Sequence, residues 1–264
     1  MPIRAVLWDV DDTLFDYTGS DRAGALRHIE AERLLARHPS PEAALARWRE
    51  VMEEQFARFV SGELGFLEHR RERARAFLGT PLPDAEADAW FGRYVALYEQ
   101  AWTLFPDAVP ALDALTPRYR HGVLSNSSAA VQERKLRRLG IRERMETLLC
   151  ADGIGHAKPA PEAFRAGCAA LGLPPREVAY VGDRYDIDAC AASEAGLHGV
   201  WLDRTGAPGA SPATGVTGVA AEAGEAPGTL GDAGEGPPAA PGVTAVTRRI
   251  TGLGELPALL ARLP

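Results

Sequence analysis

Several features that mark other protein classes are scarce in this 264-residue chain. It has three cysteines, Cys150, Cys168 and Cys190, and neither their number nor their spacing fits a disulfide framework or a metal site. Each lies among apolar or alanine-rich neighbours, so we expect free, buried thiols. A chain that keeps its cysteines free in this way is expected in the cytoplasm.

Long apolar runs and an excess of positive charge are also missing. No apolar segment approaches membrane-spanning length, and the first predicted strand begins so soon that we expect no secretory signal sequence. A formal net charge of −7 argues against a nucleic acid held through its phosphates. Neither a glycine-rich dinucleotide fingerprint nor a P-loop is present, so no nucleotide cofactor is expected. These absences leave a globular protein with no membrane or nucleic-acid partner.

The most informative stretch of the sequence is an acidic turn near the amino terminus. An apolar run over residues 5–8 is followed at once by Asp9 and Asp11, which predicts a buried strand that ends in two carboxylates. Ligands of open α/β sheets bind at the carboxyl ends of the strands. Two like charges this close need a shared proton or a cation, and such an all-oxygen cluster suits Mg²⁺ together with phosphate oxygens and water. The residues alone therefore indicate metal-assisted phosphate chemistry.

Three later motifs extend this pattern along the chain. One apolar run ends at Ser125 and Asn126, Lys158 follows in a His-Ala-Lys-Pro sequence, and another apolar run leads to Asp183 and, five residues on, Asp188. With Asp-Val-Asp-Asp-Thr-Leu at residues 9–14, these motifs stand in the order typical of the haloacid dehalogenase superfamily. The chain resembles this superfamily from residue 5 to about residue 199, and within it the phosphatases of subfamily IA, which carry a helical cap of the first type (C1).

Strand and helix patterns alternate through most of the chain, which predicts an α/β fold with a doubly wound, parallel, Rossmann-like sheet. The resemblance implies the same core with an inserted helical cap. We expect the core to consist of residues 1–15, 106–203 and 243–264. Its predicted elements are strands at 5–8, 122–124, 147–150, 178–181, 199–202 and within 243–250, and helices at 128–139, 160–171, 186–195 and 255–263.

Residues 16–105 are too many for a single connection between strands, and apolar residues recur in them at helical spacing. We expect four helices, at 23–37, 41–60, 67–78 and from residue 84 onward, which bury one another as the cap. Ser40 is the expected N-cap of the second helix, with Pro41 in its first turn. The arginines of the third helix are expected on a solvated face because acidic residues lie among them.

The composition changes abruptly near the end of the core. Residues 206–242 contain ten glycines and six prolines among 37 residues, with no lysine, arginine or aromatic residue. Such a segment buries too little apolar surface to offset the entropy of ordering it. We therefore predict a disordered insertion over residues 204–242.

The resemblance implies distinct roles for the first two carboxylates. Asp9 has the position of the nucleophile, which attacks phosphorus to give an aspartyl-phosphate. Asp11 has the position of the general acid and base, which protonates the leaving alkoxide and later helps to deprotonate water. The dehalogenases that named the superfamily lack an aspartate there, because a halide needs no proton. Asp11 therefore favours phosphoryl transfer over cleavage of a carbon–halogen bond.

The remaining motif residues are expected to surround the phosphoryl group. The resemblance implies that Ser125 donates a hydrogen bond to it, that Asn126 makes a lesser contact, and that Lys158 balances its negative charge. Mg²⁺ is the implied cofactor. Its expected ligands are a carboxylate oxygen of Asp9, the backbone carbonyl of Asp11 and the carboxylate of Asp183, while Asp188 is expected to orient a metal-bound water or Lys158.

The predicted function is Mg²⁺-dependent hydrolysis of a small phosphate monoester through an aspartyl-phosphate. A cap of this size suits small metabolites, so a sugar phosphate, a phosphoglycolate-like acid or a nucleoside monophosphate is the expected substrate. Two alternatives stay open: a phosphomutase on the same fold, which returns the phosphoryl group to its substrate, and a non-catalytic binding protein.

Overall fold

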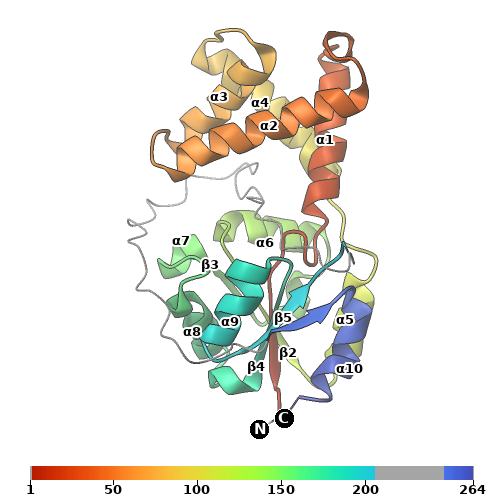
Figure 1. The fold of residues 1–264 in the computed structure, drawn as a ribbon, viewed down its shortest axis with the longest axis vertical. Helices are drawn as coiled ribbons and strands as arrows, with labels where there is room; N and C mark the ends of the chain where they lie inside the picture. Colours follow the sequence, from red (N-terminus) through yellow and green to blue (C-terminus); the bar gives the residue numbers. More distant parts are fainter. Residues whose placement is uncertain (1, 206–246, 264) are drawn as a thin grey trace. The chain divides into compact units, whose positions relative to one another are not determined.

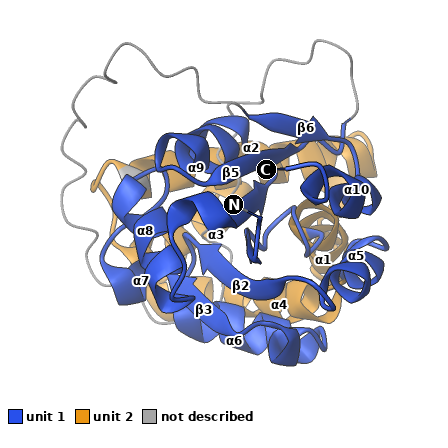
Figure 2. Cartoon of the chain, turned by 90° about the horizontal axis from the view of Figure 1, so that it is seen from below, with its two compact units in different colours: residues 1–16, 104–214, 228–264 blue, residues 17–103, 215–227 orange. Residues whose placement is uncertain are grey.

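The computed structural model describes residues 2–205 and 247–263, so most of the predicted insertion lies outside the described residues. These residues form two compact units, coloured separately in Figure 2. One unit contains residues 2–16, 104–205 and 247–263, and the other contains residues 17–103. Among the helices of the described ranges, none combines the length and apolar character needed to cross a membrane.

A six-stranded parallel sheet forms the centre of the first unit (Figure 1). Its strand order is β3-β2-β1-β4-β5-β6. The chain adds β2 and β3 on one side of β1 and then β4, β5 and β6 on the other, so the strand order reverses between β1 and β4. The predicted doubly wound α/β fold is confirmed. The strands are β1 (Ala5–Trp8), β2 (Arg120–Ser125), β3 (Thr147–Cys150), β4 (Val178–Gly182), β5 (His198–Leu202) and β6 (Arg248–Ile250).

Helices cover both faces of this sheet, which is why its central strands are apolar along their whole length. Every residue of β1 is fully buried. On one face, α8 and α9 pack over a core that includes Leu7, Phe164 and Tyr180, while α5 and α10 lie on the other face (Figure 2). The helices of this unit are α5 (Ala108–Leu115), α6 (Ala129–Arg138), α7 (Ala151–Ile154), α8 (Pro161–Ala170), α9 (Ala191–Glu194) and α10 (Leu256–Leu260).

Three expectations for this unit need correction. Helix α5 was not predicted; its Pro110 lies in the first turn, where a helix tolerates proline. The helix expected over 186–195 is divided into a π-helical turn, η4 (Tyr185–Cys190), and α9. In this turn the carbonyl oxygen of Arg184 accepts from Asp188 N and from Ala189 N, both at 3.2 Å, and Asp188 Oδ2 accepts from Arg184 N at 3.1 Å. The expected burial of all three cysteines fails at Cys190, which is only half-buried.

The second unit consists of four helices, α1 (Tyr17–Ala31), α2 (Pro41–Val60), α3 (Phe66–Leu78) and α4 (Asp84–Gln100), and a single turn, η1 (Leu35–Arg37). The boundaries of α2 are those predicted, and the Ser40 side chain caps it by accepting from Ala43 N at 3.2 Å. The helix expected over 23–37 instead begins at Tyr17 and ends at Ala31. It ends there because Arg33 adopts a left-handed conformation, with φ of 58°.

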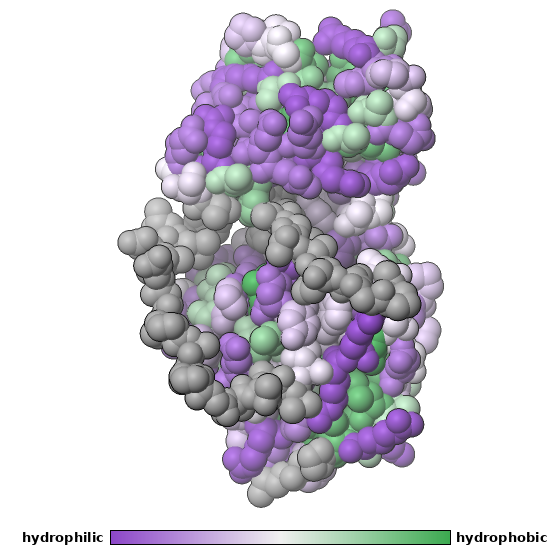
Figure 3. Space-filling view, in the orientation of Figure 1, coloured by the Kyte–Doolittle hydropathy of each residue, from purple (hydrophilic) through white to green (hydrophobic). Residues whose placement is uncertain are grey.

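Aromatic rings fill the centre of the second unit. Trp48 lies 4.6 Å from Tyr94 between ring centroids, and His28 lies 4.3 Å from Trp90. Burial lowers the pKa of His28 to about 4, so this histidine is a neutral core residue. Outside the core, much of the surface of this unit on the face drawn in Figure 3 is hydrophilic.

One arginine of α3 departs from the solvated face expected for that helix. Arg73 is only 2% exposed, its Nη2 lies 3.4 Å from the carbonyl oxygen of Met52, and its guanidinium lies 6.0 Å from the centre of the Phe91 ring. Arg71 and Arg75 do lie near the surface, where both form ion pairs with Asp84. The charge pattern of α3 therefore gave the wrong expectation for Arg73, whose aliphatic stem and guanidinium are buried.

Two glycines of this unit give a test of its packing. A Cβ at Gly24, in α1, would lie 2.5 Å from the Cα of Tyr98 in α4, whereas a Cβ at Gly92 would meet nothing within 4 Å. We predict that Gly24→Ala destabilises the protein by about 1–3 kcal/mol. Gly92→Ala, the matched control, is expected to stabilise it by roughly 0.5–1 kcal/mol, because alanine favours the helix. Urea unfolding measures both, and equal effects would contradict this packing.

Candidate active site

Asp9 follows β1 directly and lies at the carboxyl edge of the sheet, beside the point where the strand order reverses. Its backbone N–H donates to the carbonyl of Val181 in β4 at 2.9 Å, which holds it in line with the neighbouring strand. Its two carboxylate oxygens have different partners: Oδ1 accepts from Lys158 Nζ at 2.7 Å, and Oδ2 accepts from Thr13 Oγ1 at 3.2 Å. The side chain is therefore fixed on both sides.

A compact loop carries the chain from Asp9 to Phe15. Leu14 and Phe15 both donate their backbone N–H groups to the carbonyl of Val10, and Asp12 adopts a left-handed conformation with φ of 56°. Asp12 thus forms the turn, because aspartate tolerates this conformation better than most residues do. Thr13 ties the loop to β4, because its Oγ1 accepts from Asp183 N at 3.1 Å while it donates to Asp9.

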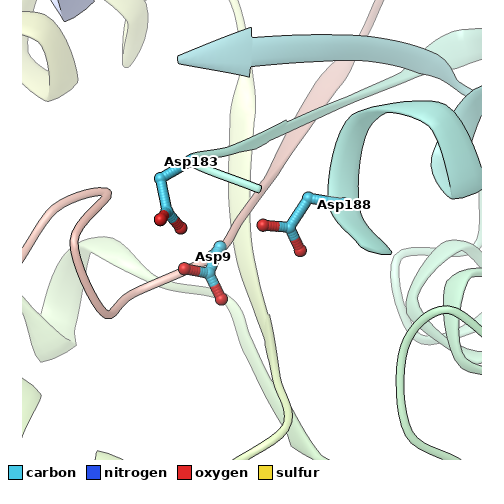
Figure 4. Close-up of side chains that lie close together, drawn as sticks. All are labelled: Asp9, Asp183 and Asp188. Atoms are coloured by element: carbon cyan, nitrogen blue, oxygen red, sulfur yellow. The ribbon is translucent and has the colours of Figure 1, made fainter. Parts of the chain in front are cut away.

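Three carboxylates meet at this edge of the sheet: Asp9, Asp183 and Asp188 (Figure 4). One oxygen of each lies within 4.8 Å of the other two. Burial raises the pKa of Asp9 to about 7, and the charges of Asp188 and Asp11 add to this effect while Lys158 opposes it. Burial and the charge of Asp9 likewise raise the pKa of Asp183 well above its usual value. The cluster therefore holds more negative charge than its surroundings offset.

Lys158 provides the positive charge of this cluster. Its Nζ lies 2.7 Å from Asp9 Oδ1, 2.7 Å from Asp188 Oδ1 and 2.8 Å from the Tyr180 hydroxyl. Burial alone would lower its pKa, but the charges of Asp188 and Asp9 raise it well above the usual value. A buried ammonium of this kind stays protonated.

The second motif places its two polar residues differently. Ser125 ends β2 and is buried, and its Oγ accepts from the backbone N–H of Ser127 at 3.2 Å. The side chain of Asn126 binds the backbone of Lys158 at both atoms, since Oδ1 accepts from Lys158 N at 2.7 Å and Nδ2 donates to its carbonyl at 2.9 Å. Asn126 thus anchors the loop that carries Lys158. Ser128, two residues further on, caps α6 by accepting from Val131 N at 3.4 Å.

The side chain of Asp11 lies apart from the three-carboxylate cluster. Its Oδ1 lies 2.6 Å from Lys135 Nζ and its Oδ2 lies 2.9 Å from Gln132 Nε2, and both partners come from α6. Gln132 Nε2 also donates to Ser125 Oγ at 3.1 Å. The structure therefore joins Asp11 to Ser125 through one amide group.

Comparison with known families identifies this arrangement. A family model described as haloacid dehalogenase-like hydrolase matches residues 3–196. The chain belongs to the haloacid dehalogenase-like hydrolases. The predicted family membership is thereby confirmed.

Curated relatives of this hydrolase include several phosphatases. It is 30% identical over 208 residues to glyceraldehyde 3-phosphate phosphatase from Methanopyrus kandleri, which covers 76% of this chain and 84% of the relative. It is 31% identical over 184 residues to phosphoserine phosphatase from Thermus thermophilus, with 69% and 67% coverage. These relatives confirm the predicted enzyme class, a phosphoric monoester hydrolase.

Solved structures share the fold. The HAD-hydrolase YfnB from Bacillus subtilis, in a magnesium-bound orthorhombic form, matches this hydrolase with a TM-score of 0.69 at 18% identity, over 98% of this chain and 99% of the other. The L-2-haloacid dehalogenase PA0810 matches with a TM-score of 0.62 at 25% identity, over 98% and 99%. Because phosphatases and haloacid dehalogenases share this fold, the residues of the site must distinguish hydrolysis of a phosphate ester from cleavage of a carbon–halogen bond.

Three residues of the site in this hydrolase were not predicted from the sequence: Tyr180, Gln132 and Lys135. Tyr180 lies inside an apolar strand, where a tyrosine is ordinarily a packing residue. Lys135 lies in a basic stretch that resembles solvated surface. The available signal was helical spacing, because Gln132 and Lys135 lie three residues apart on the same face as the buried Val131 and Leu136.

The raised pKa of Asp9 predicts how metal-free stability of the hydrolase depends on pH. Because the folded-state pKa of about 7 exceeds the ordinary value of 3.8, this carboxyl group stabilises the fold fully below pH 3.8, and that contribution is lost as the pH rises toward 7. Asp9→Asn removes the effect. With a chelator present, we expect the stability of the variant relative to wild type to increase by roughly 2–3 kcal/mol from pH 5 to pH 8.

Denaturant unfolding at several pH values measures this difference. Thr13→Val, which leaves the Asp9 carboxylate in place, is the control and should keep a pH dependence close to that of wild type. A constant difference between Asp9→Asn and wild type across this range would show that Asp9 is ionised throughout.

Proposed function

We propose that this hydrolase is a Mg²⁺-dependent phosphatase that acts on a small phosphate monoester through a phosphoryl group carried on Asp9. The observation that carries the proposal is the placement of Asp9 at the carboxyl edge of the sheet, beside the ammonium of Lys158 and the carboxylates of Asp183 and Asp188. A nucleophile needs a fixed orientation, and hydrogen bonds to both of its oxygens supply one.

In the first step, an oxygen of Asp9 attacks phosphorus and the bond from phosphorus to the ester oxygen breaks. Asp11 gives its proton to the departing alkoxide. In the second step, Asp11 takes a proton from water, which attacks the aspartyl-phosphate and releases inorganic phosphate and free Asp9. Lys158 and Ser125 stabilise the charge of the transferring phosphoryl group. Asn126 supports Lys158 through its backbone and makes at most a minor phosphate contact.

The acidic cluster fits a hard divalent cation, because its oxygens converge and their pKa values are raised by burial and mutual repulsion. Asp9 and Asp183 would hold Mg²⁺, with the backbone carbonyl of Asp11 as a further ligand. When bound, Mg²⁺ supplies positive charge that offsets the repulsion between these carboxylates and a phosphate. Asp188 holds Lys158, and its second oxygen organises the turn η4.

The names of two relatives support the proposed substrate class. The relatives are named for glyceraldehyde 3-phosphate and phosphoserine, both small phosphate monoesters. We propose a small phosphorylated metabolite for this hydrolase: a sugar phosphate, a phosphoglycolate-like acid or a nucleoside monophosphate. Residues 17–103 are proposed as the cap that selects this substrate. We also propose a cytoplasmic location, because small phosphorylated metabolites occur there.

Asp11 is the residue that favours this activity over dehalogenation, since a halide leaves without a proton. A haloacid dehalogenase would have no use for the two hydrogen-bond donors that hold the Asp11 carboxylate. The site therefore supports transfer of a phosphoryl group, whose alkoxide leaving group needs the proton.

Phosphate release from a panel of small esters tests this function. The panel contains glyceraldehyde 3-phosphate, O-phospho-L-serine, phosphoglycolate and uridine monophosphate, each assayed with Mg²⁺ and with chelator. We expect metal-dependent release from a narrow subset, and a loss of about 10⁴-fold or more in Asp9→Asn because the covalent step is removed. Unchanged activity in this variant would overturn the mechanism.

Thermal unfolding measures metal binding independently of turnover. Mg²⁺ should raise the melting temperature of wild type, because a ligand of the folded state stabilises it, and Asp183→Asn should lose this response. Asp186→Asn is the matched control, since Asp186 lies near the surface and pairs with Arg184 outside the cluster. An equal response in all three proteins would place the metal elsewhere.

A further inference from the structure

The buried face of α6 contains two polar residues that the phosphatase mechanism leaves unassigned. We propose that Lys135 and Gln132 are positioning residues that hold the Asp11 carboxylate at the angle needed for proton transfer and couple it to Ser125. This inference rests on the proposed function, because it concerns how Asp11 performs its role. Neither residue is proposed to touch the reacting atoms.

The contacts of Asp11 come from two directions. Lys135 Nζ lies 2.6 Å from Oδ1, and Gln132 Nε2 lies 2.9 Å from Oδ2, so each carboxylate oxygen has its own donor. Both donors project from one helix, three residues apart, and the backbone of α6 therefore sets the distance between them. Rotation of the carboxylate would break both bonds, which restricts Asp11 to one orientation.

Lys135 is an unusual residue for its position. Its side chain is 0% exposed, whereas Arg134, Arg137 and Arg138 on the same helix are exposed. Its Nζ also lies 4.5 Å from the centre of the Phe15 ring, at the end of the loop that contains Asp11. A buried ammonium is costly unless it is paired, and an apolar residue would serve packing at least as well. The ion pair with Asp11 therefore supports a role for Lys135 in holding that carboxylate.

Gln132 extends the same device to the phosphate-binding side. Its Nε2 donates both to Asp11 Oδ2 and to Ser125 Oγ, at 2.9 and 3.1 Å. Its Oε1 is buried and accepts no hydrogen bond from any described residue. The orientation of the Gln132 amide therefore satisfies Asp11 and Ser125 and leaves its own oxygen without a donor among the described residues. One group thereby fixes the spacing between the residue that moves the proton and the residue expected to bind the phosphoryl group.

The leaving group separates positioning from general structural support. An alkoxide needs the proton of Asp11, whereas p-nitrophenolate leaves as a stable anion and needs it little. Lys135→Met keeps the apolar stem and removes the ammonium. We expect it to lower kcat/KM, which reports formation of the aspartyl-phosphate and not its later hydrolysis, by about 10- to 100-fold on O-phospho-L-serine or on whichever alkyl ester of the panel is hydrolysed best. The loss on p-nitrophenyl phosphate should be clearly smaller. Gln132→Met should show the same pattern, and Arg138→Met on the exposed face should show no loss.

A double-mutant cycle with Asp11→Asn decides the pathway of the effect. If Lys135 acts through Asp11, Lys135→Met costs nothing further once the carboxylate is gone. Thermal unfolding of every variant confirms that it is folded, and Gln132→Met supplies the same cycle if Lys135→Met does not fold. Equal losses of kcat/KM on both esters would overturn the positioning role, and so would losses that multiply in the double variant. The proposed phosphatase function would stand in that case, provided that wild type is active and Asp9→Asn is inactive. An inactive wild type, or an active Asp9→Asn, would overturn the proposed function itself and this inference with it.

Discussion

Repulsion among the carboxylates of Asp9, Asp183 and Asp188 is the constraint on which the rest of this hydrolase depends. One ammonium, that of Lys158, lies among them and contacts two of the three. A single positive charge leaves the cluster negative, which is why burial and mutual repulsion raise the pKa values of Asp9 and Asp183. The proposed divalent cation would offset this negative charge. The cluster is therefore costly for the protein without a cation and favours cation binding.

The sheet makes such a cluster possible. Asp9 and Asp183 follow two adjacent parallel strands, although 174 positions separate them in the sequence, and the reversal of strand order leaves the edge between them open. Supporting residues then remove the freedom of each charged group. Thr13 joins the two strand ends, Asn126 fixes the backbone of Lys158, and Tyr180 holds its Nζ. Precision at the site thus comes from rigid strands and from buried polar contacts between their ends.

The elements that could be predicted are those whose signals lie in consecutive residues of the sequence. The apolar run before Asp9 predicted β1 and its acidic end, and Ser40 with Pro41 fixed the start of α2. Tertiary contacts escaped prediction. Lys135 lies among arginines that face solvent, and although helical spacing places it on the buried face, the sequence does not identify Asp11 as its partner. The burial of Arg73 was missed for the same reason, and the π-helical turn η4 contains a side-chain hydrogen bond of Asp188 that the sequence pattern did not indicate.

The central claim is that Asp9 carries the phosphoryl group during turnover. Rapid mixing of the enzyme with Mg²⁺ and the best ester of the panel, followed by acid quenching and peptide mass spectrometry, tests it most directly. The account predicts one added phosphoryl group on the peptide that contains Asp9, formed before phosphate is released and missing in Asp9→Asn. Phosphate release with no modification of that peptide, or a phosphoryl group on another residue, would contradict it.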